Sequence, residues 1–541
     1  MGTLSFEAAG AAAAAVEAHV PGLVRDQVAG RLMSADATLW GPDAEPEASI
    51  RLGWTDPGPA SRPLLGQIAE LRAALAAEGI TRVVLAGMGG SSLAPEVITR
   101  TAGVPLTVLD STDPDAVRAA LADNLAGTVI VVSSKSGSTV ETDSQRRVFE
   151  QAFTDAGLDA ASRIVVVTDP GSPLDEAARA AGYRAVFNAD PNVGGRYSAL
   201  TAFGLVPAGL AGADIEALLD DAEEAGEVLR DDAEDNIGLQ LGAALGGTDP
   251  LRNKIVIVDE GSGLPGFGDW AEQLIAESTG KLGRGLLPVV VEPGAPELSA
   301  EAADVLAVRL VPVDADAAPA GNAVQVAGSL GGQMMLWEFA TAVAGRLLGI
   351  NPFDQPDVEA AKKAARGLLD AQPAPELPAF VDGAVEVRAD AALLNGTTTL
   401  RGALQTLLAT LPEDGYLSVQ AYLDRGEQAG LETVRPLLAG LCGRPVTFGW
   451  GPRFLHSTGQ FHKGGPAQGV FLQITGAPAE DQAIPGRPFT FGELIQAQAA
   501  GDAQVLADHG RPVLRLNLIN RADGSSELEN VVRAMSRDGK R

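Results

Sequence analysis

Apolar runs alternate with amphipathic segments along the first part of the chain. The run at residues 128–132 is unbroken and β-branched, which is typical of a strand buried on both faces. Segments with apolar residues on one face, such as 66–78, predict helices between these runs. Short strands that alternate with helices predict a parallel, doubly wound sheet. The predicted strands are 81–86, 104–109, 128–132, 164–167 and 185–187, and the predicted helices are 66–78, 114–124, 140–153 and 173–181.

The alternation resumes after an acidic helical segment at residues 213–247. A Pro-rich stretch at 371–378 then predicts a linker near residues 370–380. The strands predicted beyond the linker either complete a second sheet or form a third unit, and the pattern leaves both possibilities open. The predicted strands are 254–258, 287–291 and 305–310 before the linker and 416–422, 446–448, 469–474 and 513–517 after it, with helices near 268–279 and 326–348.

These patterns predict an α/β fold with two doubly wound parallel-sheet domains, each of three α/β/α layers, and with N- and C-terminal extensions. Residues 1–60 are expected to form an Ala-rich helix followed by an irregular extension. Residues 61–250 are expected to form the first domain. Residues 251–541 are expected to form the second domain, including the C-terminal α/β portion.

Charge and composition exclude several classes of function. The 541 residues carry a net charge of −30, which argues against nucleic-acid binding but leaves room for a small anionic ligand. A single cysteine, Cys442, excludes an internal disulfide and fits a reducing compartment, where it is expected to be a small buried apolar residue. The start of the chain lacks a basic signal region, and charged residues interrupt the apolar stretch at 326–350. We therefore expect a cytoplasmic protein without a membrane role.

A hydroxyl-rich loop follows the buried run at 128–132 and opens a helix. Hydroxyls and free amides at a helix N-terminus bind phosphate well. An ordinary N-cap is the alternative, but it needs only one hydroxyl. The loop contains Ser133, Ser134, Lys135, Ser136, Gly137, Ser138, Thr139 and Thr142.

A second Gly/Ser turn, GMGGSSLAP at residues 87–95, follows the strand predicted at 81–86. Its Gly-x-Gly-Gly lacks the spacing of a dinucleotide-binding motif. Ligands in open α/β sheets bind at the carboxyl ends of strands, so both turns are expected to share one crevice.

Five segments together resemble a known family. The turn GMGGSSLAP and the loop VSSKSGSTVET resemble the sugar-isomerase (SIS) phosphosugar-binding domain. NVGGRYSA at 192–199, AESTGK at 276–281 and FDQPDVEAAK at 353–362 resemble motifs of the glucose-6-phosphate isomerase family. The segments stand in the family's order and cover roughly residues 80–365, so the resemblance implies SIS-type domains.

The resemblance also implies roles for individual residues. The hydroxyl loop would hold the substrate phosphate, and the first turn would line the sugar end. Glu277 would be the base that moves a proton between C1 and C2, with Arg196 beside the reacting carbons and Lys362 near the ring oxygen. The implied substrate-binding residues are Gly90, Ser91, Ser134, Lys135, Ser136, Thr139, Thr142, Gly195 and Gln355.

Physical chemistry is compatible with these roles. One carboxylate can make both proton transfers of an aldose–ketose isomerisation, and a fixed guanidinium can stabilise the enediolate oxygen. Each residue also has a plainer alternative. In the plainer alternative, Glu277 is only a solvated residue near a helix end, and Arg196 only clamps a helix terminus. Lys362 is then an ordinary solvated lysine on a helix.

The chain departs from the family at histidine, which suits ring opening at neutral pH. No histidine lies between residues 20 and 455, where many members of the family carry one. The segment GPRFLHSTGQFHKGG contains His456 in a His-Ser-x-Gly-Gln pattern and His462 beyond it. This order resembles the isomerase half of bifunctional transaldolase/isomerase chains. His456 is the first candidate for ring opening and His462 the second, with a purely structural role as the alternative for either.

We therefore expect an enzyme that interconverts glucose 6-phosphate and fructose 6-phosphate. No metal or cofactor is expected, because no metal-ligand cluster or nucleotide-binding loop stands out. The resemblance implies a homodimer with shared active sites, in which the neighbouring subunit supplies the histidine. Two alternatives stay open, namely a non-catalytic phosphosugar-binding regulator and an isomerase that also accepts mannose 6-phosphate.

Overall fold

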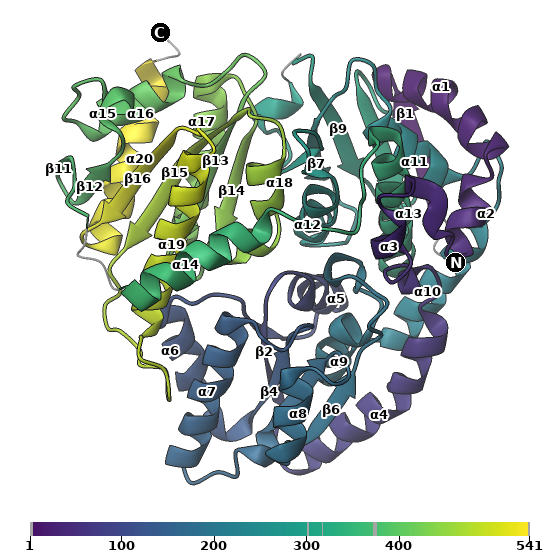
Figure 1. Cartoon of the computed structure of the whole chain (residues 1–541), viewed down its shortest axis with the longest axis horizontal. Coiled ribbons are helices and arrows are strands. Elements are labelled where there is room, and N and C mark those ends of the chain that lie inside the picture. Colours follow the sequence, from purple (N-terminus) through teal and green to yellow (C-terminus); the bar gives the residue numbers. More distant parts are fainter. Residues whose placement is uncertain (1–3, 300–301, 316–317, 372–375, 539–541) are drawn as a thin grey trace. The chain divides into compact units, whose positions relative to one another are not determined.

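A computed structural model describes residues 4–299, 302–315, 318–371 and 376–538 (Figure 1). The chain divides into two compact units, each built from discontinuous segments. Unit 1 comprises Met1–Asp110, Ala120–Pro293 and Ala303–Gln355, and unit 2 comprises Ser111–Ala119, Gly294–Ala302 and Pro356–Arg541. Parallel strands with helical connections dominate both units, so the predicted α/β class is confirmed. In the described ranges, no helix is both long enough and apolar enough to cross a bilayer.

The first sheet of unit 1 is entirely parallel and has the strand order β3-β2-β4-β5-β6. The chain passes from β2 to β3 in one direction along the sheet and from β4 to β5 in the opposite direction. The carboxyl ends of the neighbouring strands β2 and β4 therefore form the topological switch point, where ligands bind in such sheets. The strands are β2 (Arg82–Gly87), β3 (Thr107–Leu109), β4 (Thr128–Ser133), β5 (Ile164–Thr168) and β6 (Ala185–Asn188). The helices are α4 (Gly58–Ala77), α5 (Leu93–Ala102), α7 (Val140–Asp155), α8 (Pro173–Ala180) and α9 (Ala202–Ala211). Helix α6 (Pro114–Ala122) lies between β3 and β4 in the sequence, but most of it belongs to unit 2.

The second sheet of unit 1 has the order β1-β10-β9-β7-β8. Four strands are parallel, and β1 from the start of the chain pairs antiparallel with β10 at the edge. The strands are β1 (Ser5–Ala9), β7 (Lys254–Asp259), β8 (Leu287–Val291), β9 (Val305–Leu310) and β10 (Ala323–Ala327). The helices are α1 (Ala11–Arg25), α2 (Val28–Met33), α3 (Glu45–Ala48), α10 (Ile215–Leu229), α11 (Ile237–Gly246), α12 (Phe267–Thr279) and α13 (Leu330–Leu348).

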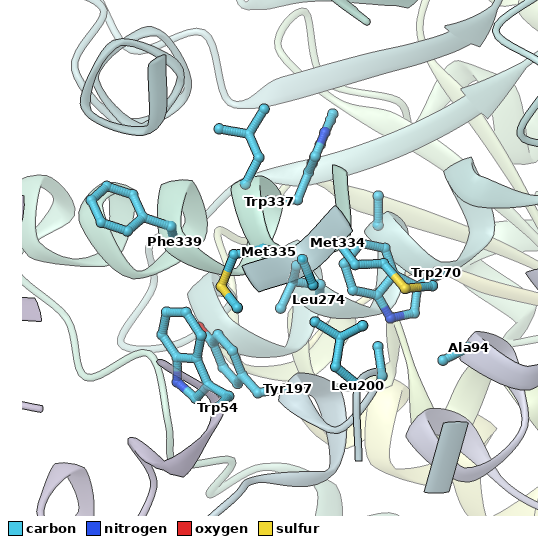
Figure 2. Close-up of a cluster of buried hydrophobic side chains, with 14 of the residues drawn as sticks. Trp54, Ala94, Tyr197, Leu200, Trp270, Leu274, Met334, Met335, Trp337 and Phe339 are labelled. Atoms are coloured by element: carbon cyan, nitrogen blue, oxygen red, sulfur yellow. The ribbon is translucent and has the colours of Figure 1, made fainter. Parts of the chain in front are cut away.

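One continuous apolar core joins the two halves of unit 1. Figure 2 shows side chains of α12 and α13 lying beside Trp54, Tyr197 and Leu200. The rings of Trp54 and Tyr197 stack with centroids 5.1 Å apart. This core fixes the carboxyl-terminal end of α12 against the residues that follow the first sheet, and Glu277 lies in that end of the helix.

Unit 2 contains a third sheet with the order β11-β12-β16-β15-β13-β14 and its own apolar core. The strands beyond the predicted linker therefore form a separate sheet, which was one of the two possibilities left open. The strands are β11 (Phe380–Asp382), β12 (Val385–Arg388), β13 (Tyr416–Tyr422), β14 (Val446–Trp450), β15 (Gly469–Gly476) and β16 (Val513–Leu518). The helices are α14 (Val358–Ala371), α15 (Ala391–Leu394), α16 (Leu400–Ala409), α17 (Val434–Cys442), α18 (Gly459–Gly464), α19 (Phe491–Asp508) and α20 (Arg521–Asp538).

Some predicted boundaries differ from the structure. Helix α13 begins at Leu330, later than predicted, because Val326 and Ala327 belong to strand β10. Both elements are buried, so their apolar residues run together without a period that separates strand from helix. Part of the predicted linker, residues 372–375, lies outside the described residues.

Candidate functional site

The hydroxyl loop connects β4 to α7, as predicted. Ser134 Oγ and Thr139 Oγ1 are 3.0 Å apart, and so are the hydroxyl oxygens of Ser136 and Ser138. Thr139 is the N-cap residue of α7, yet its side chain makes no capping hydrogen bond to the helix. These four hydroxyls are therefore bonded in pairs rather than to the helix amides, and the buried hydroxyl of Thr142 has no partner among the described residues. That helix end is thus able to receive an anion.

Lys135 of the hydroxyl loop forms an ion pair with Asp169, with 2.7 Å between Nζ and Oδ2. Burial raises the pKa of the Asp169 carboxyl, and the neighbouring ammonium partly opposes this shift. The lysine is thus held at the loop by a partner from the end of β5.

The first Gly/Ser turn lies against the segment that carries Arg196. A Cβ atom added to Gly90 would fall 1.9 Å from the carbonyl oxygen of Gly195, so only glycine fits here. Ser91 ends the short 3₁₀ turn Gly89–Ser91 and is buried. The structure therefore brings together Gly90, Ser91 and Gly195, three of the predicted residues.

Arg196 and Glu277 form a buried charged pair in unit 1. Arg196 Nη2 lies 3.7 Å from Glu277 Oε1, and the residues are 3% and 9% exposed. Gln273, one helical turn earlier on α12, donates from Nε2 to Glu277 Oε2 over 3.0 Å. The next residue, Ser278, donates its hydroxyl to the buried Tyr197 Oη over 3.3 Å, which ties α12 to the Arg196 segment.

Arg196 also holds the segment at 351–355. Its guanidinium donates to the backbone oxygens of Pro352, Phe353 and Asp354 and to Gln355 Oε1. Gln355, which the resemblance implies as a substrate-binding residue, is thereby placed beside Arg196. Most guanidinium donors face this segment, so its orientation relative to Glu277 is set by protein contacts.

Lys281 is a buried member of this cluster whose role is not evident from the sequence. Its ammonium donates to Asn351 O at 2.7 Å and to both the backbone and a side-chain oxygen of Asp354 at 2.6 Å. The motif AESTGK contains it, but its acceptors lie at least 70 positions away in the sequence, so spacing alone could not reveal its role.

Lys362 and the two candidate histidines belong to unit 2. Lys362 lies on an exposed stretch of α14, and His456 ends the short 3₁₀ helix Arg453–His456 with its side chain partly exposed. His462 is only 2% exposed, and its ring bonds Tyr416 Oη through Nδ1 at 2.9 Å. Burial holds the pKa of His462 well below its usual range. His456 is therefore the more accessible imidazole.

Gln460 links the elements that carry these two residues. The backbone N–H of Asp357 donates to Gln460 Oε1 over 3.0 Å, and Gln460 Nε2 donates to Asp357 Oδ2 over 2.7 Å. Asp357 immediately precedes α14, and Gln460 lies on α18, directly after the His456 turn. Within unit 2, the start of the Lys362 helix is thus fastened to the histidine segment.

Comparisons with known proteins point to one family. The phosphoglucose isomerase profile matches residues 70–247. Glucose-6-phosphate isomerase of Synechococcus elongatus is 31% identical over 352 residues, covering 54% of this chain and 66% of that protein. Glucose-6-phosphate isomerase of Rubrobacter xylanophilus is 31% identical over 420 residues, covering 64% of this chain and 94% of that protein.

A solved structure shares the fold. A hypothetical protein from Thermus thermophilus aligns with a TM-score of 0.57 at 26% identity, over 68% of this chain and all of that one. The match to the curated relatives is partial in several cases. The chain spans 66% of the Synechococcus elongatus protein and 42% of its counterpart from Cyanothece.

Proposed function

Because this chain belongs to the glucose-6-phosphate isomerase family, we propose that it catalyses the reversible isomerisation of D-glucose 6-phosphate and D-fructose 6-phosphate. The reaction opens the sugar ring and moves a proton between C1 and C2 through a cis-enediol. The observation that carries the proposal is the buried carboxylate of Glu277, 3.7 Å from the buried guanidinium of Arg196.

Glu277 is the proposed base. A carboxylate can remove the proton from C2 of the open-chain aldose and return it to C1, so no second base is needed. The hydrogen bond from Gln273 fixes one carboxylate oxygen and orients the other. A positioned base of this kind contributes about 10²–10⁴-fold to the rate.

Arg196 is the proposed stabiliser of the intermediate. Negative charge grows on the C1 and C2 oxygens when the proton leaves, and a fixed guanidinium in a site with little water lowers the energy of that state. The bonds from Arg196 to the segment at 351–355 hold the cation in place before the substrate arrives. Preorganisation of this kind avoids the cost of reorienting dipoles during the reaction.

The hydroxyl loop is the proposed phosphate site. Ser134, Ser136, Thr139 and Thr142 supply hydroxyls at the start of α7, and Lys135 supplies a cation. The helix dipole adds favourable potential for a dianionic phosphate. Binding energy from this remote group orients the sugar for proton transfer.

Ring opening is assigned to His456, with Lys362 beside the ring oxygen. An imidazole can take a proton from the C1 hydroxyl and return one to the ring oxygen. The proposal includes a cytoplasmic homodimer in which active sites are shared between subunits. A non-catalytic phosphosugar-binding regulator would not need the buried Arg196 and Glu277 pair. We therefore favour an isomerase over a regulator.

The decisive experiment replaces Glu277 by glutamine, which keeps the size of the side chain. We expect Glu277→Gln to lose at least about 10²-fold in turnover while still binding the sugar phosphate. The exposed Glu216 of α10 supplies a matched control, and Glu216→Gln should keep full activity. Full turnover in Glu277→Gln, or no isomerase activity in the unmodified protein, would end the assignment. Mannose 6-phosphate tested in the same assay decides whether the activity is dual.

A further inference from the structure

Lys281 is a buried cation placed directly after the helix that carries Glu277. It is 2% exposed, and lysine is rarely buried to this extent without partners. An ammonium has three N–H donors. All three have acceptors within 2.7 Å, namely Asn351 O, Asp354 O and Asp354 Oδ1. Its ammonium is therefore engaged by the protein itself, as expected for a residue that holds a segment in place.

The acceptors of Lys281 belong to the segment at 351–355 that Arg196 also holds. The carbonyl oxygens of four successive residues, from Asn351 to Asp354, accept hydrogen bonds from these two cations. Gln355, the last residue of the segment, accepts a bond from Arg196 through its side chain. The segment is therefore clamped between the end of α12 and the 3₁₀ turn Gly195–Tyr197.

We propose that Lys281 is a positioning residue for the isomerisation, which fixes the segment at 351–355 and thereby sets Arg196 and Gln355 against Glu277. The proposal rests on the function proposed above. It predicts a loss of turnover rather than of substrate affinity when the clamp is weakened, because small displacements of reacting groups cost about 10²-fold in rate.

Charges around Lys281 make the clamp dependent on pH. Burial and the nearby Arg196 together lower its pKa to about 8, although Asp354 and Glu277 oppose the shift. Asp354 faces the ammonium from the 351–355 segment, Glu277 from α12, and Arg196 from the 3₁₀ turn Gly195–Tyr197. A neutral amine has two donors and a lone pair, so one of the three acceptors would lose its bond. We therefore expect turnover to fall above about pH 8.

The test compares three variants of the full-length protein by kcat and KM between about pH 6 and pH 10. Lys281→Met removes the donors and should lower kcat about 10²-fold with little change in KM. Lys281→Arg keeps the charge and should move the alkaline fall in kcat to higher pH. Asp354→Asn removes a charge that raises the pKa of Lys281, so the fall should move to lower pH.

Arg284 supplies a matched control in the same turn. It is exposed and donates to Leu348 O over 3.1 Å, outside the clamped segment, so Arg284→Met should behave as the unmodified protein. Wild-type kcat in Lys281→Met, or an alkaline fall unmoved in both Lys281→Arg and Asp354→Asn, would overturn the positioning role alone. An inactive unmodified protein would overturn the proposed function as well. If Lys281→Met fails to fold, the two shifts of the pH profile still decide the question.

Discussion

Arg196 Nη2 and Glu277 Oε1 stand 3.7 Å apart, within ion-pair range but beyond a hydrogen bond. The guanidinium is kept at this distance by its bonds to the segment at 351–355, and Gln273 bonds the far oxygen of the carboxylate. The two opposite charges are thus held near each other without collapsing into a closed pair. A carboxylate in this arrangement keeps an oxygen available for proton transfer.

The first prediction concerns Arg196. Lysine cannot reproduce the planar fork, so Arg196→Lys should lose the bonds to the 351–355 segment along with transition-state stabilisation. We expect kcat to fall about 10²–10³-fold with a smaller change in KM, measured in a coupled assay. Arg62→Lys is the control, because Arg62 pairs with Glu223 on a solvent-accessible part of unit 1. Unchanged kcat in Arg196→Lys would contradict the role assigned to the guanidinium.

The second prediction concerns the contact between Gly90 and Gly195. Gly90→Ala would force a backbone shift, because the new Cβ would fall 1.9 Å from Gly195 O. Overpacking of this kind costs about 1–3 kcal/mol, measured as the free energy of unfolding in urea. Gly195→Ala is the matched control, since its Cβ meets nothing within 4 Å and should change stability by less than about 0.5 kcal/mol. Equal stability of the two variants would show that the turns do not touch in solution.

The third prediction separates the two histidines. His456→Ala should impair conversion of the cyclic sugar more than that of an open-chain substrate analogue, because only the cyclic sugar needs ring opening. His462→Phe should instead cost about 1–3 kcal/mol of folding free energy, since it leaves the buried Tyr416 hydroxyl without its partner. Equal losses on both substrates in His456→Ala would point to a structural role for that residue.

The dimer proposal has its own test with the same variants. Subunits carrying Glu277→Gln and subunits carrying His456→Ala are each expected to be inactive on the cyclic sugar. Mixing them under conditions that exchange subunits should restore part of the activity if one subunit supplies the histidine to the other. No recovery in verified mixed dimers would mean that each site takes both residues from one chain.

The fourth prediction concerns Glu338 on α13, whose two carboxyl oxygens are buried and have no hydrogen-bond partner among the described residues. Burial raises its pKa well above the usual value, so the folded state holds the proton more tightly than the unfolded state. Its contribution to stability is therefore full below about pH 4.3 and falls as pH rises. Glu338→Gln does not titrate and should gain on the unmodified protein by up to about 1.4 kcal/mol per pH unit above that point.

The measurement for Glu338 is urea unfolding at about pH 5 and pH 7. Glu227→Gln on the exposed face of α10 is the control and should show no such pH-dependent gain. A gain for Glu338→Gln that is the same at both pH values would contradict the raised pKa.

Much of unit 1 could be predicted because its strands are buried on both faces. Residues 128–133 are all buried in the structure, and such strands leave unbroken β-branched runs in the sequence. Strand β1 leaves a weaker signal, because its side chains are exposed or half-buried and its partner β10 lies more than 300 positions later. Pairing at that distance depends on the folded second sheet and not on local pattern.

The candidate site likewise contains residues that the sequence reveals and residues that only tertiary contacts reveal. The family motifs mark Arg196 and Glu277, because their residue types and order stand in the sequence itself. The clamp made by Lys281 could not be predicted, since a lysine after a helix is normally solvated and only tertiary contacts bury this one. Burial also distinguishes His462 from His456, although the two share one short segment.

The interleaved make-up of unit 2 limits how the chain can be divided. Its buried Arg435 pairs with Glu297, and Arg521 pairs with Asp113. These two acidic residues come from the short segments Gly294–Ala302 and Ser111–Ala119, which belong to unit 2 although they lie early in the sequence. A fragment starting at Pro356 would lack Glu297 and would therefore lose the buried ion pair of Arg435, and breaking a buried pair costs about 3–5 kcal/mol. Proteolytic nicking between the units should therefore yield pieces that stay associated, and neither gene truncation nor domain transplantation at residue 356 should give a well-folded C-terminal product.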